Sequence, residues 1–171
     1  MKIYPILTIP DAVLRKEAAS VERVDDDLRR LMDDMLGTMY DAPGVGLAAP
    51  QIGILRRVIV MDAARDDDPP DPVVMANPEI LALSDEMRTH EEGCLSIPDH
   101  TAEVERPAKI RVAFLGHDGK PQETELEGIW ATIVQHEIDH LNGVLFIDYL
   151  SRLKRDMIVK KFTKAKRVDA M

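Results

Sequence analysis

The sequence has little of several residue types, and each shortage excludes a class of protein. Its single cysteine, Cys94, rules out an internal disulfide and indicates a reducing compartment. Aromatic residues make up 4% of the 171 residues and hydrophobic residues 45%, so the core must be mainly aliphatic. No apolar run approaches the ~18 residues of a membrane span, and no basic segment precedes the short run Ile3–Ile9, unlike in a secretion signal. These absences predict a cytoplasmic protein with no membrane partner.

Positive charge is also scarce over most of the chain. The sequence has 22 Lys and Arg against 31 Asp and Glu, for a net charge of −9. This excess of negative charge argues against DNA binding and against nonspecific nucleic-acid binding by the body of the protein. The exception is residues 152–167, where eight basic residues and one acid give +7 and leave −16 for the rest.

Apolar periodicity predicts helices towards both ends of the chain and strands between them. Helices are expected at residues 25–40, 129–141 and about 151–168, and strands at 57–62, 73–76, 80–84, 86–90, 109–114 and 123–126. The acidic, proline-rich residues 65–72 predict an exposed loop. Without repeats or a linker, the pattern indicates a single α+β domain over residues 1–171. We expect small antiparallel or mixed sheets around the helix that carries His136 and His140, with further helices at the N- and C-terminal ends.

The strongest local motif is His136-Glu137-Ile138-Asp139-His140. Residues i and i+4 of a helix lie on one face, so two imidazoles can bind one metal while Glu137 reaches a water on that metal. A solvent-facing helix that carries these five residues by chance is the alternative. The apolar residues on both sides of the motif favour the metal site.

A catalytic metal in such a site needs a third protein ligand. No Glu occurs after Glu137, and the extended motif with a third His has Phe146 at that position. Asp148 is compatible with the spacing but lies close in sequence for chelation. Upstream, Cys94 lies in a polar setting after Gly93, where a thiolate is a good ligand for Zn or Fe(II).

A third segment, Gly44–Gln51, contains two alternate glycines that allow close approach of the backbone. It lacks the Gly-Lys-Ser/Thr of a phosphate-binding loop. Gln51 is a neutral hydrogen-bond donor suited to an oxyanion.

These three segments together resemble the peptide deformylase family. The family's motifs correspond, in order, to Gly44–Gln51, Glu92–Ser96 and Gln135–Leu141, and the likeness covers nearly the whole chain, including Asn142–Leu150. No motif position departs from the family pattern. The helical C-terminal segment resembles the bacterial class whose chain ends in a helix.

The resemblance implies removal of the formyl group from the formylmethionine of nascent polypeptides, with release of formate. It implies one divalent metal on Cys94, His136 and His140, Fe(II) in the cell with Zn or Ni able to substitute. Glu137 would be the general base and then the acid. Gln51 and the backbone N–H of Leu95 would stabilise the oxyanion. The alternative function is an HExxH metalloendopeptidase, which would use a downstream third ligand.

The resemblance also implies a substrate site and a partner. Gly46 would bind the peptide backbone, and Val45, Ile129 and Ile133, with Trp130 as a further candidate, would line an apolar methionine pocket. Arg106 resembles a family arginine near the site entrance, with a plain surface role as its alternative, and Glu92 is a candidate for orienting a ligand. His90, His100 and His117 match no ligand position and are expected at the surface. The basic C-terminal helix would contact ribosomal RNA near the exit tunnel, or else be a solvated helix that packs through Leu153, Met157, Ile158 and Phe162.

Overall fold

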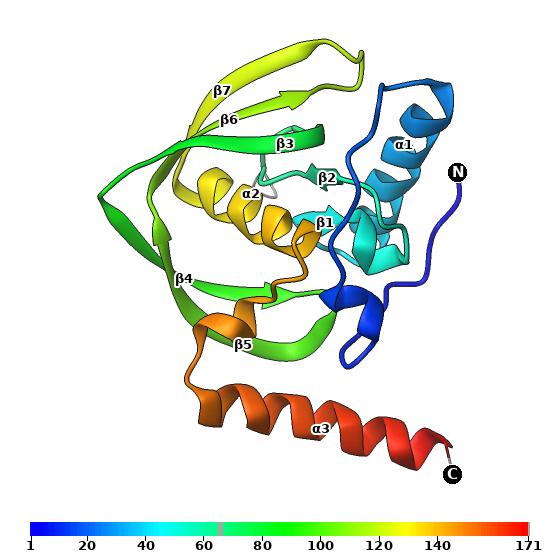
Figure 1. The fold of residues 1–171 in the computed structure, drawn as a ribbon, viewed down its shortest axis with the longest axis vertical. Helices are drawn as coiled ribbons and strands as arrows, with labels where there is room; N and C mark the ends of the chain where they lie inside the picture. The colour runs from blue at the N-terminus through cyan, green and yellow to red at the C-terminus, as the bar shows by residue number, and fades with distance from the viewer. Residues whose placement is uncertain (65–66, 171) are drawn as a thin grey trace.

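The computed structural model describes residues 1–64 and 67–170, and for residues 166–170 it describes the backbone only. Helix α2 lies between a five-stranded sheet and a two-stranded hairpin, with α1 and α3 on the outside (Figure 1). The sheet has the order β1-β2-β3-β6-β7, and its strands are Gly46–Ala48, Val58–Met61, Val73–Leu83, Lys109–Leu115 and Pro121–Glu127. The hairpin consists of β4 (Met87–Cys94) and β5 (Ile97–Pro107). The predicted α+β class is confirmed, and every described strand pairing is antiparallel.

Helix α1 (Asp26–Asp41) forms where the periodicity predicts it. The side chain of Asp25 caps the helix by accepting a hydrogen bond from the backbone N–H of Leu28 at 2.9 Å, and two further acids occupy the first turn. Its apolar face packs on one side of the five-stranded sheet.

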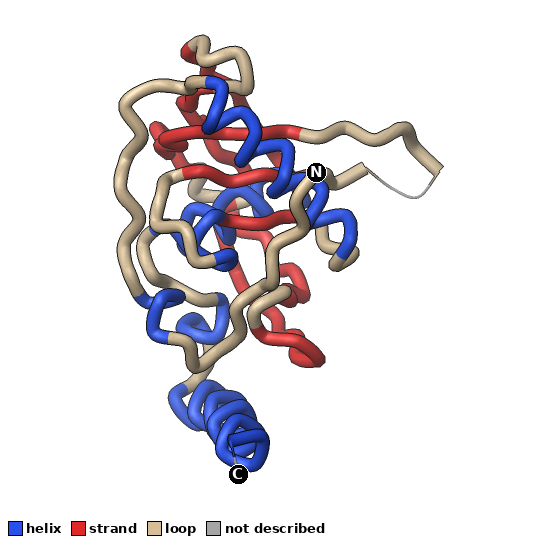
Figure 2. Tube along the Cα trace, turned by 90° about the vertical axis from the view of Figure 1, so that its right-hand side faces the viewer, coloured by secondary structure: helices blue, strands red, loops and turns tan. Residues whose placement is uncertain are grey.

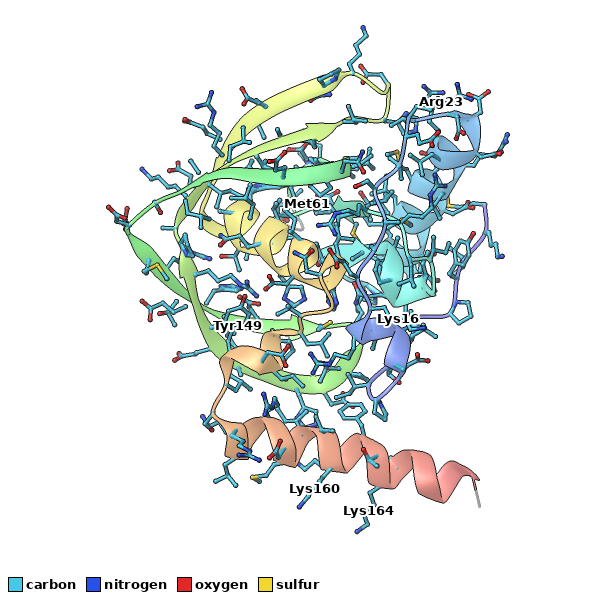
Figure 3. The ribbon with its side chains drawn as sticks, in the orientation of Figure 1. Lys16, Arg23, Met61, Tyr149, Lys160 and Lys164 are labelled. Carbon is cyan, nitrogen blue, oxygen red and sulfur yellow. The ribbon has the colours of Figure 1, made fainter. Side chains whose placement is uncertain are left out.

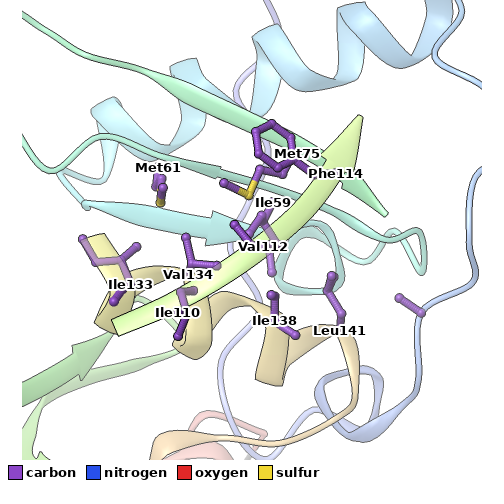
Figure 4. Close-up of a cluster of buried hydrophobic side chains, with 13 residues drawn as sticks. Ile59, Met61, Met75, Ile110, Val112, Phe114, Ile133, Val134, Ile138 and Leu141 are labelled. Atoms are coloured by element: carbon purple, nitrogen blue, oxygen red, sulfur yellow. The ribbon is translucent and has the colours of Figure 1, made fainter. Parts of the chain in front are cut away.

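Strand β2 is apolar throughout because helices cover both faces of the sheet. Val58 and Val60 pack with α1, whereas Ile59 and Met61 point to the other face and pack with α2 (Figure 4). Since successive side chains of a strand point to opposite faces, a strand between two helical layers needs no polar positions. The same core fixes α2 (Gly128–Leu141) against the sheet.

Strand β5 is absent from the sequence-based prediction, and its pattern explains why. The strand contains two prolines and several charged residues, and its buried positions include Val104 and Arg106. Alternating hydrophobicity therefore does not mark it. The register with β4 pairs Glu92 with Ala102 and so turns the Glu92 side chain towards α2.

Strand β3 corrects a second prediction, because it is one continuous strand where two, at residues 73–76 and 80–84, were expected. The irregularity is a shift of register between Ala76 and Glu79, where Asn77 takes a φ of 49°. The Asn77 amide hydrogen-bonds both backbone groups of Val21, which holds this bend in place. In the loop expected at 65–72, residues 67–72 are exposed, and residues 65–66 lie outside the described residues.

After α2, Gly143 takes a left-handed φ of 73° and ends the helix as the Asn-Gly pair predicts. Two further 3-10 helices are short. Helix η1 (Ala12–Arg15), near the N-terminus, contacts η2 (Ala49–Ile52), and η3 (Phe146–Tyr149) contacts both hairpin strands and leads to α3 (Arg152–Ala170). Figure 2 shows α3 nearly end-on, set apart at one end of the molecule. It packs on the hairpin region through Ile158, Val159 and Phe162.

Candidate metal centre and active site

Three segments far apart in sequence meet in a cleft between the five-stranded sheet and the hairpin. Strand β1 and the following 3-10 helix η2 (Ala49–Ile52) supply Gly46 and Gln51, and the end of β4 supplies Cys94. Helix α2 supplies His136, Glu137 and His140, which the surrounding layers bury to 8%, 4% and 1% exposure.

The expected ligands fit a metal ion. One ligand atom each of Cys94, His136 and His140 lies within 4.8 Å of the others, and Cys94 Sγ is 3.3 Å from His140 Nε2. Ligands at 2.0–2.3 Å on a tetrahedral centre lie roughly 3.3–3.8 Å apart, so small side-chain shifts suffice. The alternative ligand Asp148 is instead engaged by Arg15 at 2.6 Å.

Glu92 orients the imidazole of His136. His136 Nδ1 donates to Glu92 Oε1 at 2.9 Å, which leaves Nε2 for the metal. Burial opposes the charge on Glu92, but hydrogen bonds from His136 and Arg106 outweigh it and lower the pKa of this carboxyl. The ionised Glu92 carboxylate therefore accepts a hydrogen bond from His136. This bond places the proton of the His136 imidazole on Nδ1.

Glu137 is a buried carboxyl with spare hydrogen-bonding capacity. Burial raises its pKa from 4.5 to about 7, and among the described residues its Oε1 has no partner. Its Oε2 lies next to Gly46, where a Cβ would come within 2.5 Å. Only glycine at this point lets the strand approach the carboxylate so closely.

Gln51 is held from both ends of its amide. Its Oε1 accepts from the backbone N–H of Ala48 at 2.9 Å, and its Nε2 donates to Ser96 Oγ at 3.0 Å and to Cys94 Sγ at 3.5 Å. One N–H of the amide is thus held by Ser96, and the other is directed towards Cys94 in the candidate metal centre.

Comparisons with known proteins agree with this geometry. The family described as polypeptide deformylase matches residues 3–156. A peptide deformylase of Agrobacterium fabrum is 61% identical over 167 residues, 98% of each chain. Crystal structures of peptide deformylases superpose with TM-scores of 0.92 for Ehrlichia chaffeensis (38% identity, 99% and 100% of the two chains) and 0.88 for Legionella pneumophila (48%, 99% and 98%).

The chain belongs to the polypeptide deformylase family. It is a hydrolase that removes the formyl group from formylmethionine at the start of nascent polypeptides, and the alternative of a metalloendopeptidase is not favoured. Among the described helices, none has the length and apolar character of a membrane span.

The cleft of this deformylase has a volume of about 610 Å³. Gly46, Val45, Ile129 and Ile133, all expected at the substrate, line it, as does Leu95. Trp130 packs against the core cluster instead and does not line the cleft. His117 is exposed as expected, whereas His90 and His100 are half-buried and line the cleft, so the prediction that they are plain surface residues is wrong for these two.

The expectation that Arg106 lies near the entrance is wrong. Arg106 is 4% exposed and lies behind the metal centre, where its Nε and Nη2 bind both oxygens of Glu92 at 2.6 and 3.0 Å. Its third contact is Asp139 at 2.9 Å. The positive charge of Arg106 thus fixes the Glu92 carboxylate, which in turn accepts a hydrogen bond from His136.

Sequence reasoning missed two further groups of contacts. Ser96 supports Gln51, and its place beside Cys94 in the motif was the available indication. Tyr149 and Asp139 complete the surroundings of Arg106, but no spacing along the sequence points to a contact between β5, α2 and η3.

Proposed function

We propose that Cys94, His136 and His140 hold the single divalent metal of the enzyme. A thiolate with two imidazoles suits Zn and Fe(II) alike, and we assign Fe(II) in the cell with Zn or Ni able to substitute. Such a metal, when bound, lowers the pKa of a water to about 7 and polarises the formyl oxygen. Burial lowers the pKa of His140, which keeps this ligand neutral and able to bind metal.

Glu137 carries the proton transfers in this proposal. Two features support this role: burial raises the pKa of Glu137 to about 7, and its buried Oε1 has no partner among the described residues. A carboxylate with that pKa accepts a proton from water at neutral pH and gives it to the departing amine once the C–N bond breaks.

Gln51 and Leu95 stabilise the negative charge that develops on the formyl oxygen. The Gln51 amide is already fixed by Ala48 and Ser96, so little reorganisation is needed when charge appears. Leu95 follows the ligand Cys94 directly, which places its backbone amide beside the metal centre.

The edge of the five-stranded sheet offers a binding site for the substrate backbone. Strand β1 is the last strand on its side of the sheet, so an extended peptide can pair with it at Gly46. Val45, which is 55% exposed, together with Ile129 and Ile133, forms the apolar pocket for the methionine side chain. Since sheet, hairpin and α2 all contribute to the site, we propose one catalytic domain over residues 1–171.

Formate release from formylated peptides tests this function. Anaerobically purified enzyme is expected to contain one metal per chain and to hydrolyse formyl-Met peptides faster than formyl-Ala peptides, because the longer side chain buries more apolar surface. Equal rates for the two peptides would exclude the pocket. Iron-loaded enzyme is expected to lose activity in air faster than zinc-loaded enzyme, since iron promotes oxidation of itself and its thiolate.

We also propose that α3 binds ribosomal RNA near the exit tunnel. Lys160 and Lys164 are exposed and extend away from the body (Figure 3). Leu153 and Met157, which only the alternative of a solvated, packed helix would bury, are 72% and 55% exposed, so the outer face of α3 combines basic and apolar side chains. The side chains of Lys166 and Arg167 lie outside the described residues.

Co-sedimentation with ribosomes at low and high salt tests this contact. Deletion after Lys154 removes Ile158, Val159 and Phe162 from the core, so charge reversal of Lys160 and Lys164 to Glu is the milder variant. We expect salt-sensitive binding by the wild type, loss of binding in the reversed variant, and unchanged turnover of short peptides. Reversal of exposed Lys120 at the far end of the fold is the control. Undiminished binding by the variant would exclude α3.

A further inference from the structure

A continuous path of hydrogen bonds leads from the surface of the protein to His136. Tyr149 lies on η3, which contacts both hairpin strands (Figure 3), and its hydroxyl donates to Asp139 Oδ2 at 2.7 Å. The same oxygen accepts from Arg106 Nη1 at 2.9 Å. Arg106 binds both oxygens of Glu92, and Glu92 accepts from His136 Nδ1.

We infer that Tyr149 is a positioning residue for His136 and thereby for the metal, an inference that rests on the proposed role of His136 as a ligand. Tyr149 is not one of the described residues that line the cleft or form the metal-binding group. It acts on Arg106 in two ways, through the shared oxygen of Asp139 and through its ring, whose centroid is 4.7 Å from the guanidinium carbon.

The charges around Arg106 explain why it needs this support. One edge of the guanidinium is bound by Glu92. Among the described residues, Asp139 alone binds the remaining Nη1, and the Asp139 side chain is 21% exposed. The Tyr149 hydroxyl fixes the Asp139 carboxylate on one side, and its ring covers the guanidinium face. Without Tyr149, water reaches this face and the Arg106–Glu92 pair gains freedom to shift, which loosens the orientation of His136.

A purely structural role is the alternative, since the same contacts also attach η3 to the hairpin. The chain provides a matched control in Tyr40, in the last turn of α1. Tyr40 is 45% exposed and donates to buried Asp62 at 2.6 Å, while Tyr149 is 50% exposed and donates to Asp139 at 2.7 Å. Loss of either hydroxyl removes a hydrogen bond from a tyrosine to an aspartate. Only the bond of Tyr149 is connected, through Asp139, Arg106 and Glu92, to the proposed ligand His136.

The experiment compares Tyr149→Phe, Tyr149→Leu and Tyr40→Phe in the metal-loaded enzyme. The readouts are the rate of metal loss to excess chelator, the absorption spectrum of the cobalt-substituted enzyme, and kcat and KM separately. Removal of groups that orient metal ligands typically weakens metal binding 10- to 100-fold. We expect about 3-fold faster metal loss for Tyr149→Phe and about 10-fold for Tyr149→Leu, a changed cobalt spectrum, a lower kcat and an unchanged KM. Tyr40→Phe should leave the rate of metal loss and the cobalt spectrum at the wild-type level.

A Glu92→Gln background makes the test sharper. If Tyr149 acts through Arg106 and Glu92, Tyr149→Phe adds no further metal loss once Glu92 is changed. Wild-type rates of metal loss and a wild-type cobalt spectrum in both Tyr149 variants would overturn the inference, as would equal effects of Tyr40→Phe. Failure of the metal site itself is recognised separately, because Cys94→Ala would then retain metal as well as the wild type does.

Discussion

Helices α1 and α2 cover opposite faces of the same sheet, yet the side chains that they bury differ in polarity. The buried residues of α1 are Leu28, Met32, Met35 and Met39, with Thr38 as the one polar member. Helix α2 adds to its aliphatic residues a buried polar set of Thr132, Gln135, His136, Glu137 and His140.

The difference separates stability from chemistry. Apolar burial on α1 stabilises the fold directly, whereas each buried polar group of α2 is unfavourable unless it is hydrogen-bonded. Most of them are: Gln135 donates to the Pro107 carbonyl, and His136 donates to Glu92. Among the described residues, Glu137 Oε1 and His140 Nδ1 have no partner. The protein thus tolerates unfavourable burial at the helix that carries the candidate metal ligands.

Loss of a ligand should give the largest effect. Cys94→Ala is expected to remove tight metal binding and activity together, because two imidazoles alone leave the site with too few ligands. Metal analysis and formate release on the same sample measure both. Since Cys94 is only half-buried, thermal unfolding of the metal-free protein should change little. A variant that keeps stoichiometric metal would contradict the ligand assignment.

Glu137→Gln should separate binding of the metal from turnover. The amide cannot carry the proton, so kcat is expected to fall by about 100-fold or more, while metal content stays near that of the wild type. The neutral amide is easier to bury than a carboxylate, so the thermal stability of the metal-free protein should not decrease. Near-full activity would show that another group transfers the proton.

Met35→Ala tests the opposite helix. Met35 is fully buried, and truncation in such a core typically costs about 2–5 kcal/mol in the free energy of unfolding. Denaturant unfolding measures this loss. Turnover per folded molecule should stay at the wild-type level, because α1 supplies no side chain to the metal centre. A matching fall in kcat would mean that the two helices are not independent.

The same contrast explains how much of the molecule the sequence could predict. Helix α1 follows from its periodicity, and the ligands on α2 follow from an i, i+4 spacing within one element. Strand β5 could not be predicted, because its inward face includes a charged residue, Arg106, whose partners come from β4 and α2. The sequence predicted those candidate site residues that lie close together along the chain or within one motif. Those held by contacts between distant elements, such as Tyr149 with Asp139, required the fold.

Ser96→Ala should give the smallest effect. Ser96 is fully buried and accepts from Gln51 Nε2, so its loss frees one end of the amide while Ala48 still holds the other. One neutral hydrogen bond is worth about 1 kcal/mol, which corresponds to roughly a 5-fold lower kcat if Gln51 stabilises the oxyanion. KM and metal content should not change, because the substrate and the ligands do not depend on this hydroxyl. Thr101→Val removes a hydroxyl that binds Glu91 and makes no contact with Gln51, so it should leave kcat unaltered. If both variants lower kcat equally, the hydroxyl of Ser96 has no specific part in aligning Gln51, and the contacts to Ala48 and Cys94 fix the amide.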